Sequence, residues 1–162
     1  MYRMILKNNE MPKDRLKIFL SYAHEDEDMK TELDKALVML KRNNKIDVWQ
    51  DRKILAGQEW DDTINKEIES ADIILLLVSV DFNNSKYIWE KELAIAMQRH
   101  QKNEARVIPV VLRACEWQAM PYGKLQALPS GGVAVKKFAD SDEAYTDIAK
   151  GIRAVVDYML AN

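Results

Sequence analysis

The sequence predicts an α/β protein in which helices cover both faces of a parallel sheet, a doubly wound three-layer sandwich. Two observations lead there. Short, uninterrupted apolar runs, typical of strands buried on both faces, recur at 16–20, 47–50, 72–79, 106–112 and 132–138. Segments with apolar residues every three or four positions, typical of amphipathic helices, stand between them at 26–44, 59–71, 79–100 and 141–160. Strands alternating with helices indicate βαβ units.

The five strand candidates differ in strength. "LKIFL" at 16–20 is short and bounded by charge, and "DVWQ" at 47–50 is weaker. "DIILLLVS" at 72–79 and "RVIPVVL" at 106–112 are continuous apolar runs, whereas "GVAVKKF" at 132–138 is a short final candidate. The longest irregular stretch, about 113–131, contains two prolines, and we expect a surface excursion there.

The helix candidates carry apolar stripes. The stripe of 26–44 consists of Met29, Leu33, Ala36, Leu37 and Leu40, and that of 59–71 of Trp60, Ile64 and Ile68. The segment 79–100 differs because a carboxylate, Glu92, lies among apolar neighbours three and four positions away, namely Ile88, Trp89, Ile95 and Ala96. In a regular helix Glu92 would share a face with Ser85, about 10 Å farther along the axis. We therefore expect a half-buried carboxylate.

Length, charge and cysteine content limit the functions to consider. The 162 residues suit one domain, expected at 15–162 after a leader or flexible N-terminus at 1–14. The net charge of −2 gives no electrostatic reason to expect nucleic acid as a direct partner. A single cysteine excludes an intrachain disulfide, and no apolar run suggests a membrane span or a signal peptide. We therefore expect a cytoplasmic protein with no membrane partner.

Ligands of doubly wound sheets bind outside the carboxyl ends of the strands. The segments that follow the first three strands, "SYAHEDED" (21–28), "DRKILAGQEW" (51–60) and "VDFNNSKY" (80–87), are therefore expected at one edge of the sheet.

These segments carry a family resemblance. "KIFLSYAHEDED" (17–28), "VWQDRKILAGQEW" (48–60) and "SVDFNNSKYIWEKELAIAM" (79–97) resemble, in order and spacing, the three signature boxes of the Toll/interleukin-1 receptor (TIR) domain, specifically its bacterial branch. "RVIPVVLRACEW" and "GKLQALPSGG" fit the same branch, so the resemblance covers about residues 15 to 160.

The resemblance implies a flavodoxin-like fold with a five-stranded parallel sheet ordered 2-1-3-4-5. In many TIR domains of bacteria and plants, and in one animal axon-degeneration protein, it also implies cleavage of NAD+ to nicotinamide and ADP-ribose or a cyclised product. NAD+ is then a substrate, and no retained cofactor is expected. Other TIR domains are non-catalytic scaffolds that act by self-association, and the fold alone does not separate the two classes.

The expected role is that of an effector of prokaryotic antiviral defence, activated by self-assembly. The resemblance implies other TIR domains as partners, in a homo-oligomer or filament, and a sensor domain outside this chain is a further candidate partner.

Glu92, followed by Leu93, matches the family's catalytic glutamate. The family's aromatic residue often lies four positions before it, where this chain has Ile88, whereas Trp89 lies three before it. The role of Trp89 therefore stays open. A carboxylate beside the ribose would stabilise the positive charge that develops as the bond to nicotinamide breaks. One carboxylate suffices because nicotinamide is a good leaving group.

The resemblance implies a substrate pocket lined by Ser21, Tyr22, Ala23, Asp51, Arg52, Ile54, Trp60, Ser85, Ile88 and Trp89. Several of these residues suit a structural role equally well or better. Residues 21–23 also fit a strand end followed by a turn, Asp51 and Arg52 also fit a local ion pair, and Trp60 fits packing better than stacking on nicotinamide.

The segment 51–60 matches the family's BB loop, which borders the pocket and docks into a neighbouring molecule. Arg52, Ile54 and Leu55 are the expected contact residues, because consecutive large apolar residues are unusual in a loop. Gly57 is expected to supply a positive φ there.

Other chemistries lack support in the sequence. His24 and His100 have no cysteine or histidine at metal-ligand spacing, so we expect no metal site. Neither a G-x-G-x-x-G motif nor a P-loop is present. A response-regulator receiver domain shares the fold, but the acids of "HEDED" open a helix and no matching lysine follows the third strand.

Overall fold

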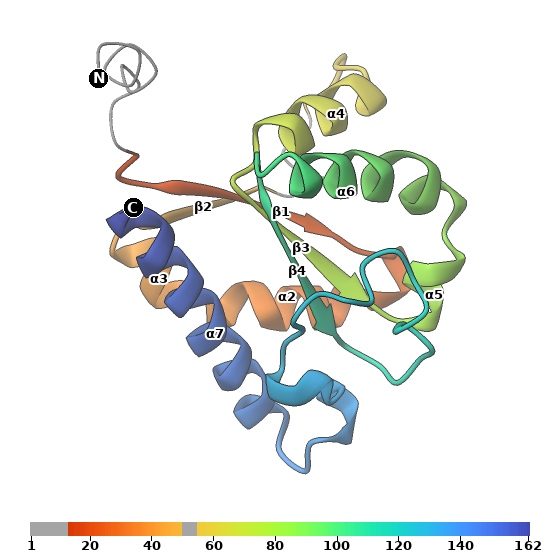
Figure 1. Ribbon diagram of the computed structural model, residues 1–162, viewed down its shortest axis with the longest axis vertical. Helices are drawn as coiled ribbons and strands as arrows, with labels where there is room; N and C mark the ends of the chain where they lie inside the picture. Colours follow the sequence, from red (N-terminus) through yellow and green to blue (C-terminus); the bar gives the residue numbers. More distant parts are fainter. Residues whose placement is uncertain (1–12, 50–54) are drawn as a thin grey trace.

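The structure, a computed structural model, describes residues 13–49 and 55–162. In this part of the chain four parallel strands form one sheet in the order β2-β1-β3-β4 (Figure 1). They are β1 (Leu16–Ser21), β2 (Ile46–Trp49), β3 (Ile73–Val78) and β4 (Arg106–Val111). The register aligns Ile18 with Val48 of β2 on one side and with Ile73 of β3 on the other. The predicted parallel sheet is confirmed for these four strands.

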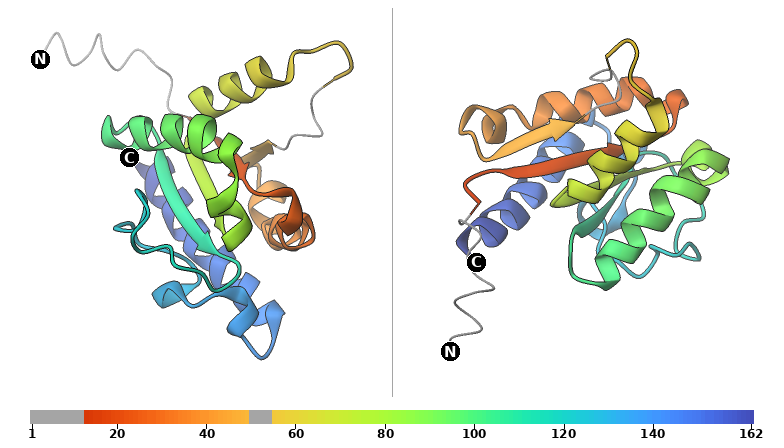
Figure 2. Two further views of the ribbon diagram at one scale, coloured as in Figure 1. Left: turned by 90° about the vertical axis from the view of Figure 1, so that its right-hand side faces the viewer. Right: turned by 90° about the horizontal axis from the view of Figure 1, so that it is seen from above.

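Helices cover both faces of the sheet, as predicted (Figure 2). One face packs against α2 (Glu27–Ala36), α3 (Val38–Arg42) and α7 (Ser141–Ala161). The other face packs against α4 (Trp60–Ser70), α5 (Val80–Asn84), a π-helical stretch (Ile88–Glu92) and α6 (Leu93–Gln101). Side chains alternate between the two cores along each strand: Leu75 and Leu77 face the first core, whereas Ile74 and Leu76 face the second.

The predicted helix at 26–44 is interrupted at Leu37, whose φ of −87° and ψ of 9° separate α2 from α3. The side chain of Lys41 spans this interruption, because its Nζ donates at 3.0 Å to the backbone oxygen of Asp34, which lies near the end of α2. A short 3₁₀ turn, His24–Asp26, precedes α2. The apolar stripe therefore forms as predicted, but on two helical pieces.

The predicted fifth strand at 132–138 is wrong. Two short 3₁₀ turns, Ser130–Gly132 and Val135–Lys137, occupy this region. Leu128 instead makes an isolated bridge with β4, donating to Pro109 at 2.9 Å and accepting from Val111 at 2.8 Å. The ladder stops there because Pro129 has no N–H to donate and the following glycines have positive φ values of 76° and 71°.

The predicted surface excursion at 113–131 is also wrong in part, since two of its aromatic side chains are buried. Trp117 and Tyr122 belong to the second core. Tyr122 packs edge-on against Phe82 of α5, with ring centroids 6.0 Å apart, and its hydroxyl donates to Asn83 Oδ1 at 2.5 Å. Burial raises the pKa of Tyr122 well above its ordinary value, so the hydroxyl keeps its proton and stays a donor.

Residues 1–12 of the predicted N-terminal segment lie outside the described residues. Lys13 forms an ion pair with Asp72, the residue before β3. Across 13–49 and 55–162, no helix is long and apolar enough to cross a membrane.

Candidate active site

A cavity of about 270 Å3 opens at the carboxyl edge of the sheet, between the segments that follow β1 and β3. The strand order reverses between these two neighbouring strands, because β2 lies beyond β1 and β4 lies beyond β3. The crevice outside such a reversal is where doubly wound sheets bind ligands. The lining residues come from four places along the chain: Tyr22, Ala23, His24 and Glu25; Trp60; Asp81, Asn84 and Ser85; and Tyr87, Ile88 and Glu92.

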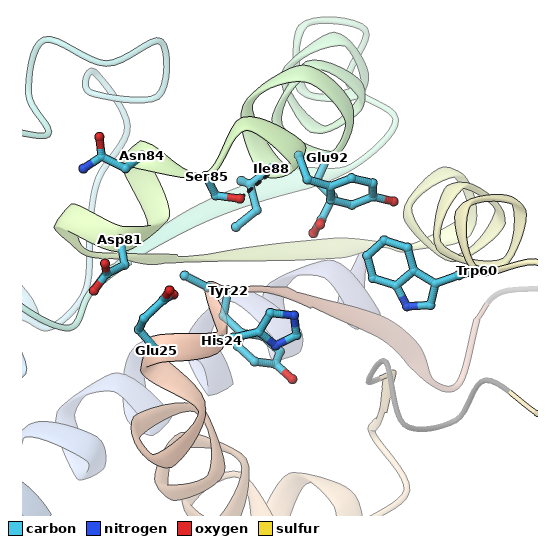
Figure 3. A pocket seen from close by; sticks show the side chains of 11 residues that line it. Tyr22, His24, Glu25, Trp60, Asp81, Asn84, Ser85, Ile88 and Glu92 are labelled. Atoms are coloured by element: carbon cyan, nitrogen blue, oxygen red, sulfur yellow. Dashed lines mark hydrogen bonds between the residues drawn. The ribbon is translucent and has the colours of Figure 1, made fainter.

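Glu92 brings a carboxylate into this cavity although only 8% of its surface is exposed. Figure 3 shows Glu92 facing His24 across the space, with Trp60 toward one end and Glu25 and Asp81 toward the other. The predicted burial of this carboxylate is confirmed, and it is more complete than the half-burial that the sequence indicates. Charged carboxylates are rarely buried to this degree outside functional sites or ion pairs.

The helical segment 86–101, here called the Glu92 helix, is not a regular α-helix. At its π-helical stretch the N–H of Leu93 bonds to the backbone oxygen of Ile88, five residues back. Five residues of a regular α-helix would turn Leu93 well away from the face of Ile88. The π turn brings both side chains into the second core. Glu92, the residue before Leu93, is thereby held at the rim of that core. Single π turns within α-helices are frequent at functional sites.

Ser85 lies outside the helix, and the predicted shared helical face with Glu92 is wrong. The backbone of Ser85 is extended, with ψ of 113°, because it ends α5. The residue then opens the Glu92 helix: its Oγ accepts from Ile88 N at 3.3 Å and its carbonyl from Trp89 N at 3.0 Å. Serine suits this capping position because its oxygen satisfies an N–H at the first turn. Ser85 and Glu92 still line the same cavity.

An aromatic pair forms one wall of the cavity. The rings of Trp60 and Tyr87 lie 4.7 Å apart with a tilt of 42°. The Tyr87 hydroxyl donates to Asp61 Oδ1 at 3.1 Å, which ties the start of α4 to the start of the Glu92 helix. The ring of Tyr87 is thus fixed at both its face and its hydroxyl.

An ionic network centred on the buried Asp26 supports the same edge of the sheet. Asp26 is 1% exposed and accepts from Arg113 Nε at 2.9 Å and from the hydroxyl of Ser79. Arg113 also donates to Asp81, a cavity residue. The hydrogen bond to Asp26, and to a lesser extent the one to Asp81, raises the pKa of the Arg113 guanidinium above its ordinary value, so the guanidinium stays protonated. One arginine therefore connects the segments after β1, β3 and β4.

The sequence reasoning missed this network. Asp26 and Arg113 are 87 positions apart, and no local pattern pairs them. The available signal was position: Asp26, Asp81 and Arg113 all follow strands that end at the same edge.

The cavity gathers several of the residues that the sequence predicts for the site: Tyr22, Ala23, Trp60, Ser85, Ile88 and Glu92. Ser21 is buried and Trp89 is 46% exposed, and neither lines the cavity. Asp51, Arg52 and Ile54 lie outside the described residues. The binding roles of all these residues stay predictions.

Four lining residues were not predicted to bind substrate: Glu25, Asp81, Asn84 and Tyr87. His24, which also lines the cavity, belongs to the loop 21–24 that the sequence predicts to shape the pocket. All five lie in the segments after the first and third strands, so the rule that placed the site at those segments was sufficient to find them.

Three carboxylates, those of Glu25, Asp81 and Glu92, line the cavity, and Asp81 forms an ion pair with Arg113. No lysine or arginine stands among the described lining residues. No cluster of three or more metal-ligating side chains occurs within 13–49 and 55–162.

The segment after the undescribed residues 50–54 presents an exposed apolar side chain. Leu55 is 70% exposed, and Gly57 has a φ of 90°, the positive value expected for it. The N–H of Leu55 donates to the side chain of Gln58 at 2.7 Å, which closes a turn just before α4.

The chain is similar to known proteins over most of its length. It is 46% identical over 136 residues to the "Uncharacterized protein y4lF" of Sinorhizobium fredii (strain NBRC 101917 / NGR234), an alignment that covers 84% of this chain and 42% of that protein. The chain thus spans less than half the length of this curated relative.

The fold is similar to that in the crystal structure of the RPS4 and RRS1 TIR domain heterodimer, with a TM-score of 0.58 over 85% of this chain and 96% of the matched chain. At 12% identity this likeness shows the fold alone. The family model of the TIR domain matches residues 18–151. The chain therefore belongs to the TIR domain family.

Proposed function

We propose that this TIR domain is an NAD+ glycohydrolase that releases nicotinamide, with Glu92 as its catalytic carboxylate. The observation that carries the proposal is the burial of Glu92 at the rim of a cavity, at the edge of the sheet where this fold binds ligands. The family resemblance assigns the catalytic role to the same position.

The reaction requires the bond between the ribose C1′ and the nicotinamide nitrogen to break. Nicotinamide leaves with the electron pair and becomes neutral, so positive charge develops on the ribose. The carboxylate of Glu92 stabilises that charge, and its confinement makes the stabilisation stronger than in water. Water then bonds to C1′ and loses a proton to give ADP-ribose, or a nucleophile of the same molecule takes its place and gives a cyclised product.

Self-assembly regulates this activity in our proposal. The exposed Leu55 in the segment 51–60 is suited to contact a second TIR domain, together with Arg52 and Ile54. The solved structure with a similar fold is a TIR domain heterodimer. We assign the domain to the bacterial branch and to antiviral defence in the cytoplasm, with assembly triggered by a sensor outside this chain.

The product of the reaction tests the proposal. Proton NMR of NAD+ incubated with the protein, dilute and with a crowding agent, resolves nicotinamide, ADP-ribose and a cyclised product. We expect nicotinamide release that rises on crowding and is absent from Glu92→Ala. Equal release by Glu92→Ala would remove Glu92 from the mechanism, and no release in any assembled state would overturn the enzyme proposal.

A non-catalytic scaffold is the second candidate function, because the exposed Leu55 supports self-association whether or not Glu92 is catalytic. A scaffold requires self-association but not Glu92. Leu55→Asp should lower the self-association measured by light scattering under either function. Strong association combined with no cleavage of NAD+ would establish the scaffold instead.

A further inference from the structure

We propose that a second cavity, beside β4, binds a small apolar carboxylate of the medium-chain fatty acid class. This cavity of about 440 Å3 lies between β4, the segment 125–131 and α7. It is here called the β4 cavity. It shares no lining residue with the cavity of Glu92, so the inference does not rest on the proposed function.

The β4 cavity forms because the chain beside β4 meets that strand at a single bridge. Leu128 donates to the carbonyl of Pro109 at 2.9 Å and accepts from the N–H of Val111 at 2.8 Å. The next bond toward the amino end of the strand would need an N–H from residue 109, and proline has none. Residues 125–127 therefore line a cavity instead of extending the ladder.

Most of the wall of the β4 cavity is apolar. Aliphatic residues from three parts of the fold line it: Val107 and Ile108 of β4; Leu125, Ala127 and Leu128; and Val155 of α7. Its volume lies in the range of small-molecule pockets, about 300–1,000 Å3. An aliphatic chain would displace water from this wall, and each buried methylene strengthens binding about threefold.

One arginine of the β4 cavity carries a charge that no carboxylate balances. Arg106 forms no ion pair with an acid in the part of the chain that the structure describes. Its guanidinium lies 5.5 Å from the ring centroid of Tyr158, one helical turn beyond Val155 on α7. This contact holds the cation beside the apolar wall. A guanidinium binds a carboxylate through two parallel N–H groups.

A buried nitrogen supports the same ligand chemistry. His100 of α6 lines the β4 cavity, and its Nδ1 is buried without a hydrogen-bond partner among the described residues. Buried polar atoms normally have a partner, so a ligand that pairs with this nitrogen gains binding energy. A carboxylate oxygen accepts from Nδ1 when that nitrogen carries a proton. No aspartate or glutamate stands among the described lining residues, so no charge of the wall opposes a bound anion.

Calorimetric titrations with four aliphatic probes test the β4 cavity without requiring catalysis. The probes are octanoate, hexanoate, octanol and octylamine. We expect saturable binding of one octanoate per chain. Hexanoate should bind about tenfold more weakly, because it lacks two methylenes. Octanol and octylamine should bind at least about fivefold more weakly than octanoate. Octanol binding as tight as that of octanoate would overturn the carboxylate site.

Two variants locate the binding. Arg106→Gln should weaken octanoate binding about fivefold, the size of a partly exposed ion pair, and leave octanol binding unchanged. Val155→Phe adds volume to the wall and should abolish binding of both. Arg153→Gln is the matched control, because Arg153 is an exposed arginine of α7 that does not line the cavity. Equal weakening by Arg106→Gln and Arg153→Gln would overturn the site.

A second copy of the chain is the alternative occupant. Light scattering of the wild type and of Val155→Phe, with and without octanoate, distinguishes the two. Octanoate binding with self-association unchanged in Val155→Phe supports the carboxylate. Self-association that falls in Val155→Phe, together with no octanoate binding, would assign the cavity to a neighbouring domain and overturn the proposal.

Discussion

The Glu92 helix and α7 show two ways in which a helix meets this sheet. In α7 the buried residues recur at regular helical spacing through Ala144, Ile148, Ile152 and Val156, and the helix is continuous for 21 residues. In the Glu92 helix, Ile88 and Leu93 are buried five positions apart across a π turn. Regular spacing fills a core, whereas the irregular spacing accompanies a buried carboxylate beside a cavity. Both helices contribute to a core, and in our proposal only the Glu92 helix also supplies a catalytic group.

The largest effect on stability is expected in α7. Ile148 is fully buried in the first core, so Ile148→Ala removes apolar contacts and leaves a cavity. We expect the free energy of unfolding to fall by about 4 kcal/mol. The rate of NAD+ cleavage per folded molecule should not change. Chemical denaturation followed by circular dichroism, with an activity assay at matched folded fraction, measures both.

The next largest effect is expected in the ionic network. Arg113→Met leaves Asp26 buried without its cationic partner, so the free energy of unfolding should fall by about 3 kcal/mol. Adding Asp26→Asn removes the stranded charge and should recover part of this loss. A double variant as unstable as the single one would mean that the cost lies elsewhere than in the buried charge.

A deletion in the π turn should affect chemistry far more than stability. Removing the exposed Glu90 leaves Ile88 and Leu93 four residues apart, the spacing of a regular α-helix. We expect the unfolding free energy to change by less than about 1 kcal/mol, because both side chains still face the core. Nicotinamide release should fall at least about tenfold, since small displacements of a catalytic group are costly. A large loss of stability would show that the π turn is needed for packing.

The smallest effect is expected at Trp89. This side chain is exposed and lies outside the cavity, so Trp89→Ala should change the unfolding free energy by less than about 0.5 kcal/mol. NAD+ cleavage should also be unchanged. A clear loss of activity would reveal a role for Trp89 beyond a single domain, such as a contact in the assembly.

The sequence predicted what depends on local periodicity. The continuous apolar runs of β3 and β4 were sufficient to identify buried strands. The regularly spaced apolar stripe of α7 was sufficient to identify a helix that packs on the sheet. The position of Glu92 near a ligand-binding edge was also predicted, from the family resemblance and because doubly wound sheets bind ligands outside the carboxyl ends of their strands.

The rest depended on backbone details and distant contacts. The segment 132–138 has strand-like composition, but Pro129 and two glycines with positive φ redirect the chain before it. The π turn escaped prediction because apolar residues five apart fit neither a regular helix nor a strand. The pairing of Asp26 with Arg113 joins two sheet ends that only the folded chain brings together.

In our proposal Glu92 is catalytic because the π turn holds its carboxylate at the cavity. The most direct test is the rate of nicotinamide release from NAD+ for Glu92→Gln and Glu90→Gln, measured side by side in the assembled state. Both glutamates belong to the π-helical stretch, but Glu90 is exposed and pairs with Lys86 at 3.9 Å. We predict a loss of about 100-fold or more for Glu92→Gln and less than about twofold for Glu90→Gln. Equal rates for the two variants would contradict the claim.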